Sequence, residues 1–231
     1  MSEHQGLSGR VVSLQVGRAG TLRWRGQAVH SAIAKHRVDG ARVALGTEGF
    51  DGDEQADRRL HGGPDKAVCC YPSEHLPAWS SLLGRDLAPG AFGENLSLAG
   101  LTEDRVHIGD TYSLGTALVA VSQPRGPCFK VAARWGARTL PKEMAQGLQS
   151  GFYLRVLEPG AVAAGDTMTL VQRISDVSVA EVLRVTYRDR RDPPALRAVM
   201  DVPELAEEWR VGLTRLAELN RLPLADPVGD D

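Results

Sequence analysis

The spacing of apolar residues changes near Ile174, and this change constrains the fold more than any other feature of the sequence. Before it, glycine and proline interrupt the chain often, and the apolar runs between them are short and rich in Val, Leu, Tyr and Thr. After it, apolar residues recur at helical spacing. Short runs between turns are typical of strands, and the later spacing is typical of amphipathic helices. We therefore expect a β-rich body followed by a small helical unit.

The β-rich part contains several candidate strands and two candidate helices. Short strands with frequent turns favour an antiparallel barrel or sandwich. A helix is expected from Ser73 to Gly84, with Ser73 as its N-cap, and another within Phe129 to Gly136. The expected strands are Val11–Val16, Ala67–Tyr71, Asn95–Leu98, Ala117–Gln123, Gly151–Val156 and Thr167–Arg173.

Three short amphipathic helices are expected after Ile174. Ser178 and Glu181 have the spacing of a capping box at the head of the first. Asp192 and Pro193 have the pattern of an N-cap followed by a proline at the first helical position. The third helix is indicated by an apolar stripe made of Leu205, Trp209, Leu213 and Leu216.

Composition narrows the class of protein. The chain has 231 residues, of which 42% are hydrophobic and 24% charged, and its net charge is -2. This balance argues against general binding to nucleic acid or a membrane surface, although a local basic site fits it. No apolar run approaches the roughly 20 residues that span a bilayer, and the first residues are polar. We therefore expect a cytoplasmic protein without a nucleic-acid or membrane partner.

Residues 48–72 are unusually dense in charged side chains. One interpretation is a pocket wall, in which His61 precedes two glycines that let the backbone approach a ligand, and Lys66 contacts an anionic group. The other is a solvated loop with turn glycines and surface charge. A divalent-metal hydrolase built from these carboxylates is a further alternative, but the segment has neither an HExxH nor an EF-hand pattern.

The chain has three cysteines, at positions 69, 70 and 128. Their spacing is a poor disulfide framework and excludes a CxxC motif. Cys128 follows a turn rich in proline and glycine, with Arg125 and Lys130 nearby, and such cations favour the thiolate that binds soft metals. A buried structural cysteine is an equally good interpretation. Cys69 and Cys70 lie in one expected strand and point to opposite faces, so at most one lines a pocket.

Six motifs in order resemble the MOSC domain, and are most similar to its YiiM type, the 6-hydroxylaminopurine-resistance proteins. The helical end of the chain is similar to the 3-alpha domain of that type. The resemblance implies a mainly β fold with α: a MOSC β-barrel at 10–173, a three-helix domain at 174–220 and a tail at 221–231. The motifs are SAIAK (31–35), GDEQAD (52–57), HGGPDKAVCCYPSEH (61–75), FGENLS (92–97), IGD (108–110) and SQPRGPC-x-K (122–130).

The resemblance also implies a site for a molybdenum–pterin cofactor (Moco), with Cys128 as the molybdenum ligand. More distant MOSC proteins carry an arginine two residues before the motif asparagine, where this chain has Gly93. The pterin phosphate must then find other cations, such as Lys35 or Lys66. The residues implied to line the cofactor pocket are Lys35, His61, Lys66, Asn95, Arg125 and Cys128.

Relatives of this type reduce N-hydroxylated bases, amidoximes and similar compounds. We therefore expect a molybdenum-dependent reductase of small N-hydroxylated molecules. His61 is the expected catalytic proton donor beside Cys128, because the unperturbed pKa of histidine lies near working pH. The chain leaves no room for a second redox domain, so electrons are expected from a separate flavoprotein reductase. The alternative is a carrier of Moco or sulfur without turnover. The helical unit is either a docking or homodimer element or a lid on the barrel.

Overall fold

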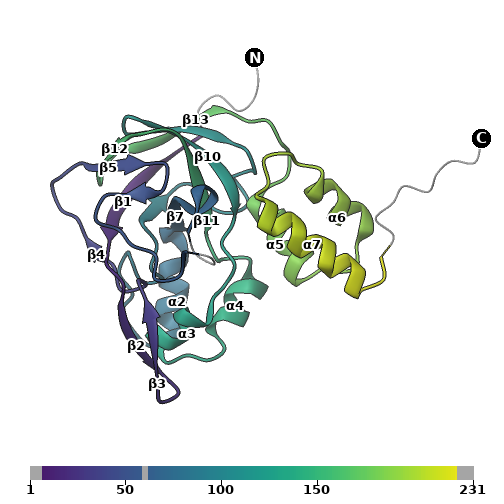
Figure 1. Cartoon of the computed structure of the whole chain (residues 1–231), viewed down its shortest axis with the longest axis horizontal. Helices are drawn as coiled ribbons and strands as arrows, with labels where there is room; N and C mark the ends of the chain where they lie inside the picture. The colour runs from purple at the N-terminus through teal and green to yellow at the C-terminus, as the bar shows by residue number, and fades with distance from the viewer. Residues whose placement is uncertain (1–6, 59–61, 223–231) are drawn as a thin grey trace, which may run out of the picture.

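A closed barrel forms the body of the computed structural model, which describes residues 7–58 and 62–222 (Figure 1). Its strands are β1 (Ser8–Val16), β7 (Val68–Pro72), β8 (Leu96–Ala99), β9 (Thr111–Leu114), β10 (Ala117–Pro124), β11 (Phe152–Glu158) and β13 (Thr167–Gln172). They pair in the order β13-β9-β10-β11-β7-β8-β1, and β1 returns to β13. Neighbours are antiparallel except β7 and β8, which are parallel. The expected mainly β fold with helices is confirmed.

All six expected strands belong to this barrel, and β9 is the barrel strand that sequence reasoning missed. Strand β9 has four residues and lies directly before the turn into β10. Its short apolar alternation is too brief to stand out from the surrounding turns. Closure depends on β9, because it joins β13 to β10.

Several short strands lie outside the barrel. A hairpin pairs β2 with β3 through a two-residue turn at Arg25 and Gly26, both with positive φ, which matches the right-handed twist of the two strands. Strand β4 extends the edge of β1, and β5, β6 and β12 form a small sheet. The bounds are β2 (Gly20–Trp24), β3 (Gln27–Ser31), β4 (His36–Arg37), β5 (Val43–Gly46), β6 (Gly49–Phe50) and β12 (Gly160–Val162).

Three helices pack on one side of the barrel: α2 (Leu76–Leu83), α3 (Phe129–Trp135) and α4 (Leu140–Gly147). The first is preceded by the 3-10 turn η2 (Ser73–His75), and η1 (Pro64–Lys66) precedes β7. The prediction of Ser73 as the N-cap was wrong, because Pro72 precedes η2 and no side chain caps it. Helix α3 matches its prediction, whereas α4 was not predicted.

The three predicted C-terminal helices are α5 (Val179–Tyr187), α6 (Pro193–Met200) and α7 (Glu207–Leu219). The Ser178 hydroxyl accepts a hydrogen bond from the Glu181 amide at 3.1 Å. Half of the capping box forms, because the Glu181 carboxylate pairs with Arg184 instead of the Ser178 amide. Asp192 caps α6 by accepting from the Ala195 amide at 3.1 Å.

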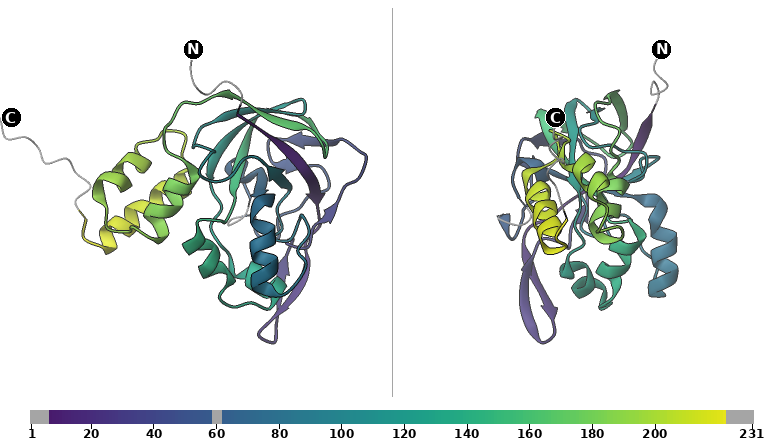
Figure 2. Two further views of the ribbon diagram at one scale, coloured as in Figure 1. Left: turned by 180° about the vertical axis from the view of Figure 1, so that it is seen from behind. Right: turned by 90° about the vertical axis from the view of Figure 1, so that its right-hand side faces the viewer.

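The helical unit is packed against the barrel (Figures 1 and 2). Its apolar stripes, including Val182 and Leu213, join the same hydrophobic core as the barrel interior. Burying each such side chain contributes about 1.5–3 kcal/mol. The Ala206 amide also donates to the Ser122 carbonyl of β10 at 3.0 Å. These contacts favour the interpretation of a lid packed on the barrel. None of the described helices has the length and apolarity needed to cross a membrane.

Candidate functional site

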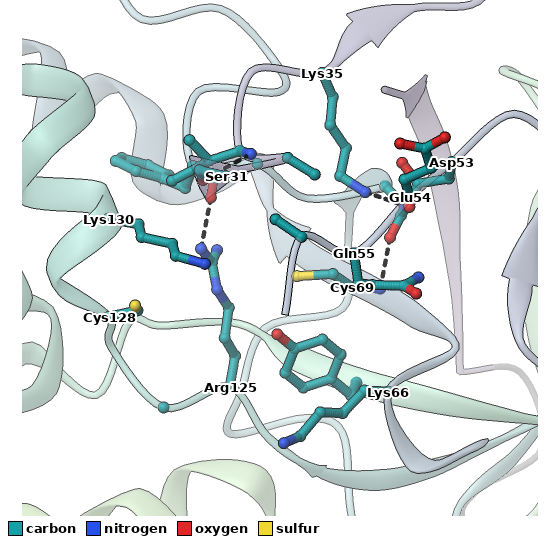
Figure 3. Close-up of a pocket in the computed structure, with 18 residues that line it drawn as sticks. Ser31, Lys35, Asp53, Glu54, Gln55, Lys66, Cys69, Arg125, Cys128 and Lys130 are labelled. Atoms are coloured by element: carbon teal, nitrogen blue, oxygen red, sulfur yellow. Dashed lines mark hydrogen bonds and ion pairs between the residues drawn. The ribbon is translucent and has the colours of Figure 1, made fainter. Parts of the chain in front are cut away.

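A pocket beside the barrel gathers segments that lie far apart in the sequence (Figure 3). The chain between β3 and β4, the segment before η1, the turn before β8 and the loop after β10 all contribute to its wall. His61 lies outside the described residues. The other five predicted site residues line this one pocket: Lys35, Lys66, Asn95, Arg125 and Cys128.

Cys128 lies at the start of α3. Its backbone is extended, with φ -111° and ψ 147°, and it occupies the N-cap position. Proline cannot donate to a sheet, so Pro124 ends β10 and the chain turns away toward α3. Cys128 is half-buried, whereas the other two cysteines are buried. Its thiol is therefore the most accessible of the three.

Cys69 also lines the pocket, and Cys70 belongs to the barrel core, as the alternation of a strand requires. Burial raises the pKa of the Cys69 thiol, so it stays protonated at neutral pH. Its hydrogen-bond partner is Tyr153 of β11, which also lines the pocket. Burial likewise raises the pKa of the Tyr153 hydroxyl, with the nearby Cys69 as the second cause. Sequence reasoning missed Tyr153, because an aromatic residue in a strand normally indicates core.

Arg125 provides a buried cation with spare hydrogen-bonding capacity. The residue is 7% exposed, and its Nη2 donates to the Phe92 carbonyl at 2.5 Å. Its Nη1 is buried without a partner in the part of the chain that the structure describes. The pKa of Arg125 is raised although burial alone would lower it, so the guanidinium stays charged. An unpaired buried donor on a cation is well suited to an anionic or carbonyl group of a ligand.

Lys35, Asp53 and Asn95 form a buried polar cluster on the opposite side of the pocket. Asp53 pairs with Lys35 at 2.5 Å and accepts from the Asn95 amide at 2.9 Å and the Gly17 backbone amide at 2.9 Å. Asn95 also donates to the Gln15 carbonyl and accepts from the Cys69 backbone amide. The Asn95 side chain therefore holds the wall together, and Asp53 neutralises Lys35. Sequence reasoning did not distinguish Asp53 from the other charged residues of 48–72 and missed this role.

Lys66 connects the pocket to the helical unit. It is 7% exposed at the end of η1, and its ammonium pairs with Glu208 of α7. The Glu208 side chain is 60% exposed, so this pair lies at the edge of the pocket. Lys35 and Lys66 were alternative candidates for binding the pterin phosphate, and both have carboxylate partners in this structure.

The backbone conformation and close packing at position 93 explain why this chain has glycine there and not arginine. The φ of Gly93 is +81°, and a β-carbon would lie 2.6 Å from Ile33 Cγ1. A side chain there would be strained by both the backbone conformation and the contact. The buried Glu94 carboxylate fixes this turn by accepting from the amides of Gly90 at 2.6 Å and Phe92 at 3.0 Å.

Several of the described carboxylates in residues 48–72 have partners other than a metal. Asp65 pairs with Arg155 at 2.8 Å, and Glu54 accepts from the Ala19 amide at 3.0 Å. Within residues 7–58 and 62–222, no group of three or more His, Cys, Asp and Glu could hold a metal ion. The described residues therefore give no support to the alternative of a metal-dependent hydrolase built on this cluster.

Two family models match the chain: the MOSC domain over residues 57–169, and the YiiM-like 3-alpha helix domain over residues 177–216. The chain is 43% identical to the uncharacterized protein YflK of Bacillus subtilis over 89% of this chain and 93% of that protein. It is 39% identical to the protein YiiM of Escherichia coli over 83% and 85% of the two. A protein named reductase from Gibberella moniliformis is 35% identical over 93% of this chain and 36% of its own length.

The fold has a solved counterpart of the same type. The crystal structure of YiiM from Geobacillus stearothermophilus aligns with a TM-score of 0.77 and 38% identity, over 94% of this chain and 100% of that one. Both the barrel and the helical unit are thus matched, by sequence and by fold. The chain belongs to the MOSC-domain family, in the group whose barrel is followed by a YiiM-like three-helix domain.

Proposed function

We propose that the protein binds a molybdenum–pterin cofactor through Cys128 and reduces small N-hydroxylated compounds. The observation that carries the proposal is the pairing, in one pocket, of an accessible thiol with a buried arginine whose Nη1 has no partner among the described residues. Thiolate suits a soft metal centre, and a guanidinium suits the anionic or carbonyl groups of a pterin ligand. Membership of the MOSC family favours the same cofactor.

The residues of the pocket fit this cofactor. Cys128 would supply the protein thiolate to the metal, whose other sulfur ligands come with the pterin. Arg125 and Lys130, whose side chains extend into the same part of the pocket in Figure 3, would bind its anionic groups. Lys35 and Lys66 would add positive potential, although each already has a carboxylate partner. The bound cofactor would supply the chemistry that accepts two electrons and passes them to an N–O bond.

The reduction converts R–NHOH, two electrons and two protons into R–NH2 and water. One proton must reach the departing oxygen. His61 remains our proposed donor, on the strength of its position in the HGGPDK motif. Tyr153 would assist as a hydrogen-bond donor, because burial raises its pKa and keeps its hydroxyl protonated.

The electrons would come from a separate flavoprotein reductase. The relative from Gibberella moniliformis that is named a reductase supports a redox role, and this chain corresponds to 36% of that longer protein. A reductase that delivers electrons in trans would make activity depend on a second protein, which a reconstitution with purified components tests.

The first experiment measures molybdenum by elemental analysis, and pterin by fluorescence, in protein made in a Moco-competent host. We expect both in the native protein and neither in Cys128→Ser. Cys69→Ser is the matched control, because Cys69 lines the same pocket but is buried and hydrogen-bonded to Tyr153. Equal molybdenum in native protein and Cys128→Ser would refute the assignment of Cys128 as the ligand.

The second experiment measures N–O reduction, with a reduced viologen dye as artificial electron donor. The loaded native protein should reduce an amidoxime, and His61→Ala should lower turnover with molybdenum content kept. Loss of molybdenum in His61→Ala would make His61 a cofactor-binding residue instead. A loaded protein that reduces no N-hydroxylated compound with any donor would be a cofactor or sulfur carrier.

A further inference from the structure

A buried carboxylate, that of Glu103, lies in the connection between β8 and β9, and the proposed chemistry does not use it. Glu103 is 2% exposed. Its Oε1 accepts from the Gly151 backbone amide at 2.8 Å, and its Oε2 lies 2.7 Å from His75 Nε2. A carboxylate only accepts hydrogen bonds, so the ring of His75 donates through Nε2–H. Burying a carboxylate costs free energy unless both oxygens are bonded, and here both are.

Gly151 connects this carboxylate to the loop that carries Cys128. It lies directly before β11 with φ +84°, and a β-carbon there would lie 2.3 Å from the Cys70 carbonyl oxygen, so only glycine fits. Its amide donates to Glu103, and its carbonyl accepts from the Arg125 amide at 2.9 Å. A shift of Gly151 away from Glu103 would therefore also shift the group that holds the backbone of Arg125.

A second route from Glu103 reaches the guanidinium of Arg125. The ring of His75 packs edge-to-face on Tyr71, with the centroids 5.8 Å apart, and Tyr71 packs on Phe92 at 4.7 Å. The Phe92 carbonyl accepts from Arg125 Nη2 at 2.5 Å. Arg125 is therefore held at its backbone through Gly151 and at its side chain through Phe92, and both routes begin at the Glu103 carboxylate.

The connection that carries Glu103 also holds the helical unit. The Glu103 carbonyl accepts from the Ala180 amide at 2.8 Å, and the Val106 carbonyl accepts from the Val179 amide at 2.8 Å. The first amides of a helix have no partner within it, so these two carbonyls satisfy the start of α5. Glu103 thus bonds to the start of the helical unit with its backbone and to the chain that holds the pocket loop with its side chain.

We propose that Glu103 is a positioning residue for cofactor binding. Its carboxylate holds Gly151, and through it the loop on which the Arg125 guanidinium and the Cys128 thiol face one pocket. Glu103 does not line that pocket, so it acts through other residues and touches neither cofactor nor substrate. This inference rests on the proposed function, because the ligand that the loop would hold is the cofactor.

Three substitutions at this position separate the possibilities. Glu103→Ala leaves the buried Gly151 amide without its acceptor. Glu103→Gln keeps an oxygen that can accept from this amide, and its NH2 group can donate to the other tautomer of His75. Glu103→Asp keeps the charge but withdraws it by one methylene, so it gives the same test as Glu103→Ala if that variant does not fold.

Asp110→Ala is the matched control. Asp110 is also a buried carboxylate, 0% exposed, and it also accepts from a backbone amide, that of His107, at 3.0 Å. Its ion-pair partner is Arg173, and its side chain does not bond to Gly151. We expect a loss of global stability in urea similar to that of Glu103→Ala, without an effect on the pocket loop.

The first measurement needs no cofactor and follows hydrogen exchange of the Arg125 amide by NMR in the folded full chain. This amide bonds to Gly151, so its exchange reports on the proposed contact. Exchange should be about tenfold faster or more in Glu103→Ala and in Glu103→Asp, because a buried amide has lost its partner. It should return to the native rate in Glu103→Gln and stay native in Asp110→Ala.

The second measurement is molybdenum per chain in protein made in a Moco-competent host. We expect a loss in Glu103→Ala and native content in Glu103→Gln and Asp110→Ala. Native exchange and native molybdenum content in Glu103→Ala and Glu103→Asp would overturn the inference. Equal changes in Asp110→Ala would overturn it as well, because general destabilisation would then explain them. Native protein without molybdenum would defeat the proposed function, and the exchange rates would still decide whether Glu103 positions the loop.

Discussion

Replacing Asp53, a member of a buried ion pair, should destabilise the protein more than replacing a member of an exposed ion pair. The Asp53 side chain is 1% exposed and the Lys35 side chain 7%, and their charged atoms are 2.5 Å apart. Asp53→Ala leaves the lysine charge buried and unpaired, which typically costs about 3–5 kcal/mol. It also removes the acceptor for the Gly17 and Asn95 N–H groups, each a loss of about 1–3 kcal/mol if unreplaced. These losses overlap, so we expect a total of about 3–5 kcal/mol.

Urea unfolding measures this loss, and the chain offers a matched control. Glu48 and Arg58 are also 2.5 Å apart, but their side chains are 54% and 69% exposed, so Glu48→Ala should cost about 0–1 kcal/mol. Lys35→Met in the Asp53→Ala background should recover part of the loss, because it removes the uncompensated charge. A loss below about 1 kcal/mol in Asp53→Ala would refute the argument that the buried pair holds this wall of the pocket.

Three further predictions concern other features. Gly93→Ala should lower the free energy of unfolding in urea by about 2–5 kcal/mol, because the β-carbon would meet Ile33. Gly84→Ala is the control and should cost about 1–2 kcal/mol, because Gly84 also has positive φ but no atoms close to its β-carbon position. Equal costs would mean that Ile33 moves aside without penalty. Iodoacetamide should label Cys128 well before Cys69, because burial shields the Cys69 thiol and raises its pKa. Peptide mass spectrometry should find no rapidly labelled cysteine in Cys128→Ser. Burial and Arg173 lower the pKa of His107, so folding favours its neutral form. The free energy of unfolding should therefore fall as the pH drops below about 6.5. His107→Asn should flatten this pH dependence, and an unchanged slope would contradict the prediction.

Local sequence patterns predicted most of the barrel. The six expected strands were apolar runs bounded by glycine or proline, and the C-terminal helices had both apolar stripes and N-cap residues. Strand β9 and helix α4 were missed, because the first is four residues long and the second begins with Leu140-Pro141 after a turn, without a capping side chain. Short elements of this kind are defined by the neighbours they pair with, which a local pattern does not contain.

The residues of the site were predictable only in part, because their roles depend on long-range contacts. Arg125 and Cys128 belong to a short motif, and the structure places both on the same pocket. Asp53 looks like the other carboxylates of its segment, and what distinguishes it is burial against Lys35 and Asn95, 18 and 42 positions away. Gln123 lies in a strand pattern, where a polar residue normally faces solvent. The helical unit lies far along the chain, and because it packs beside β10, Gln123 lines a pocket between the barrel and that unit instead.

The loop after β10 contributes to two pockets, the one that contains Cys128 and a second one between the barrel and the helical unit. Gln123 lines the second pocket, while Arg125 and Cys128 line the pocket of the candidate site. The Arg125 amide donates to the Gly151 carbonyl at 2.9 Å, so the loop stays fixed to the neighbouring chain just past the end of β10. Gly126 then lines both pockets without a side chain, and any β-carbon there would extend toward the Tyr187 hydroxyl. Because Gly126 has no side chain, it leaves open the space beside the Tyr187 hydroxyl, where the linings of the two pockets meet.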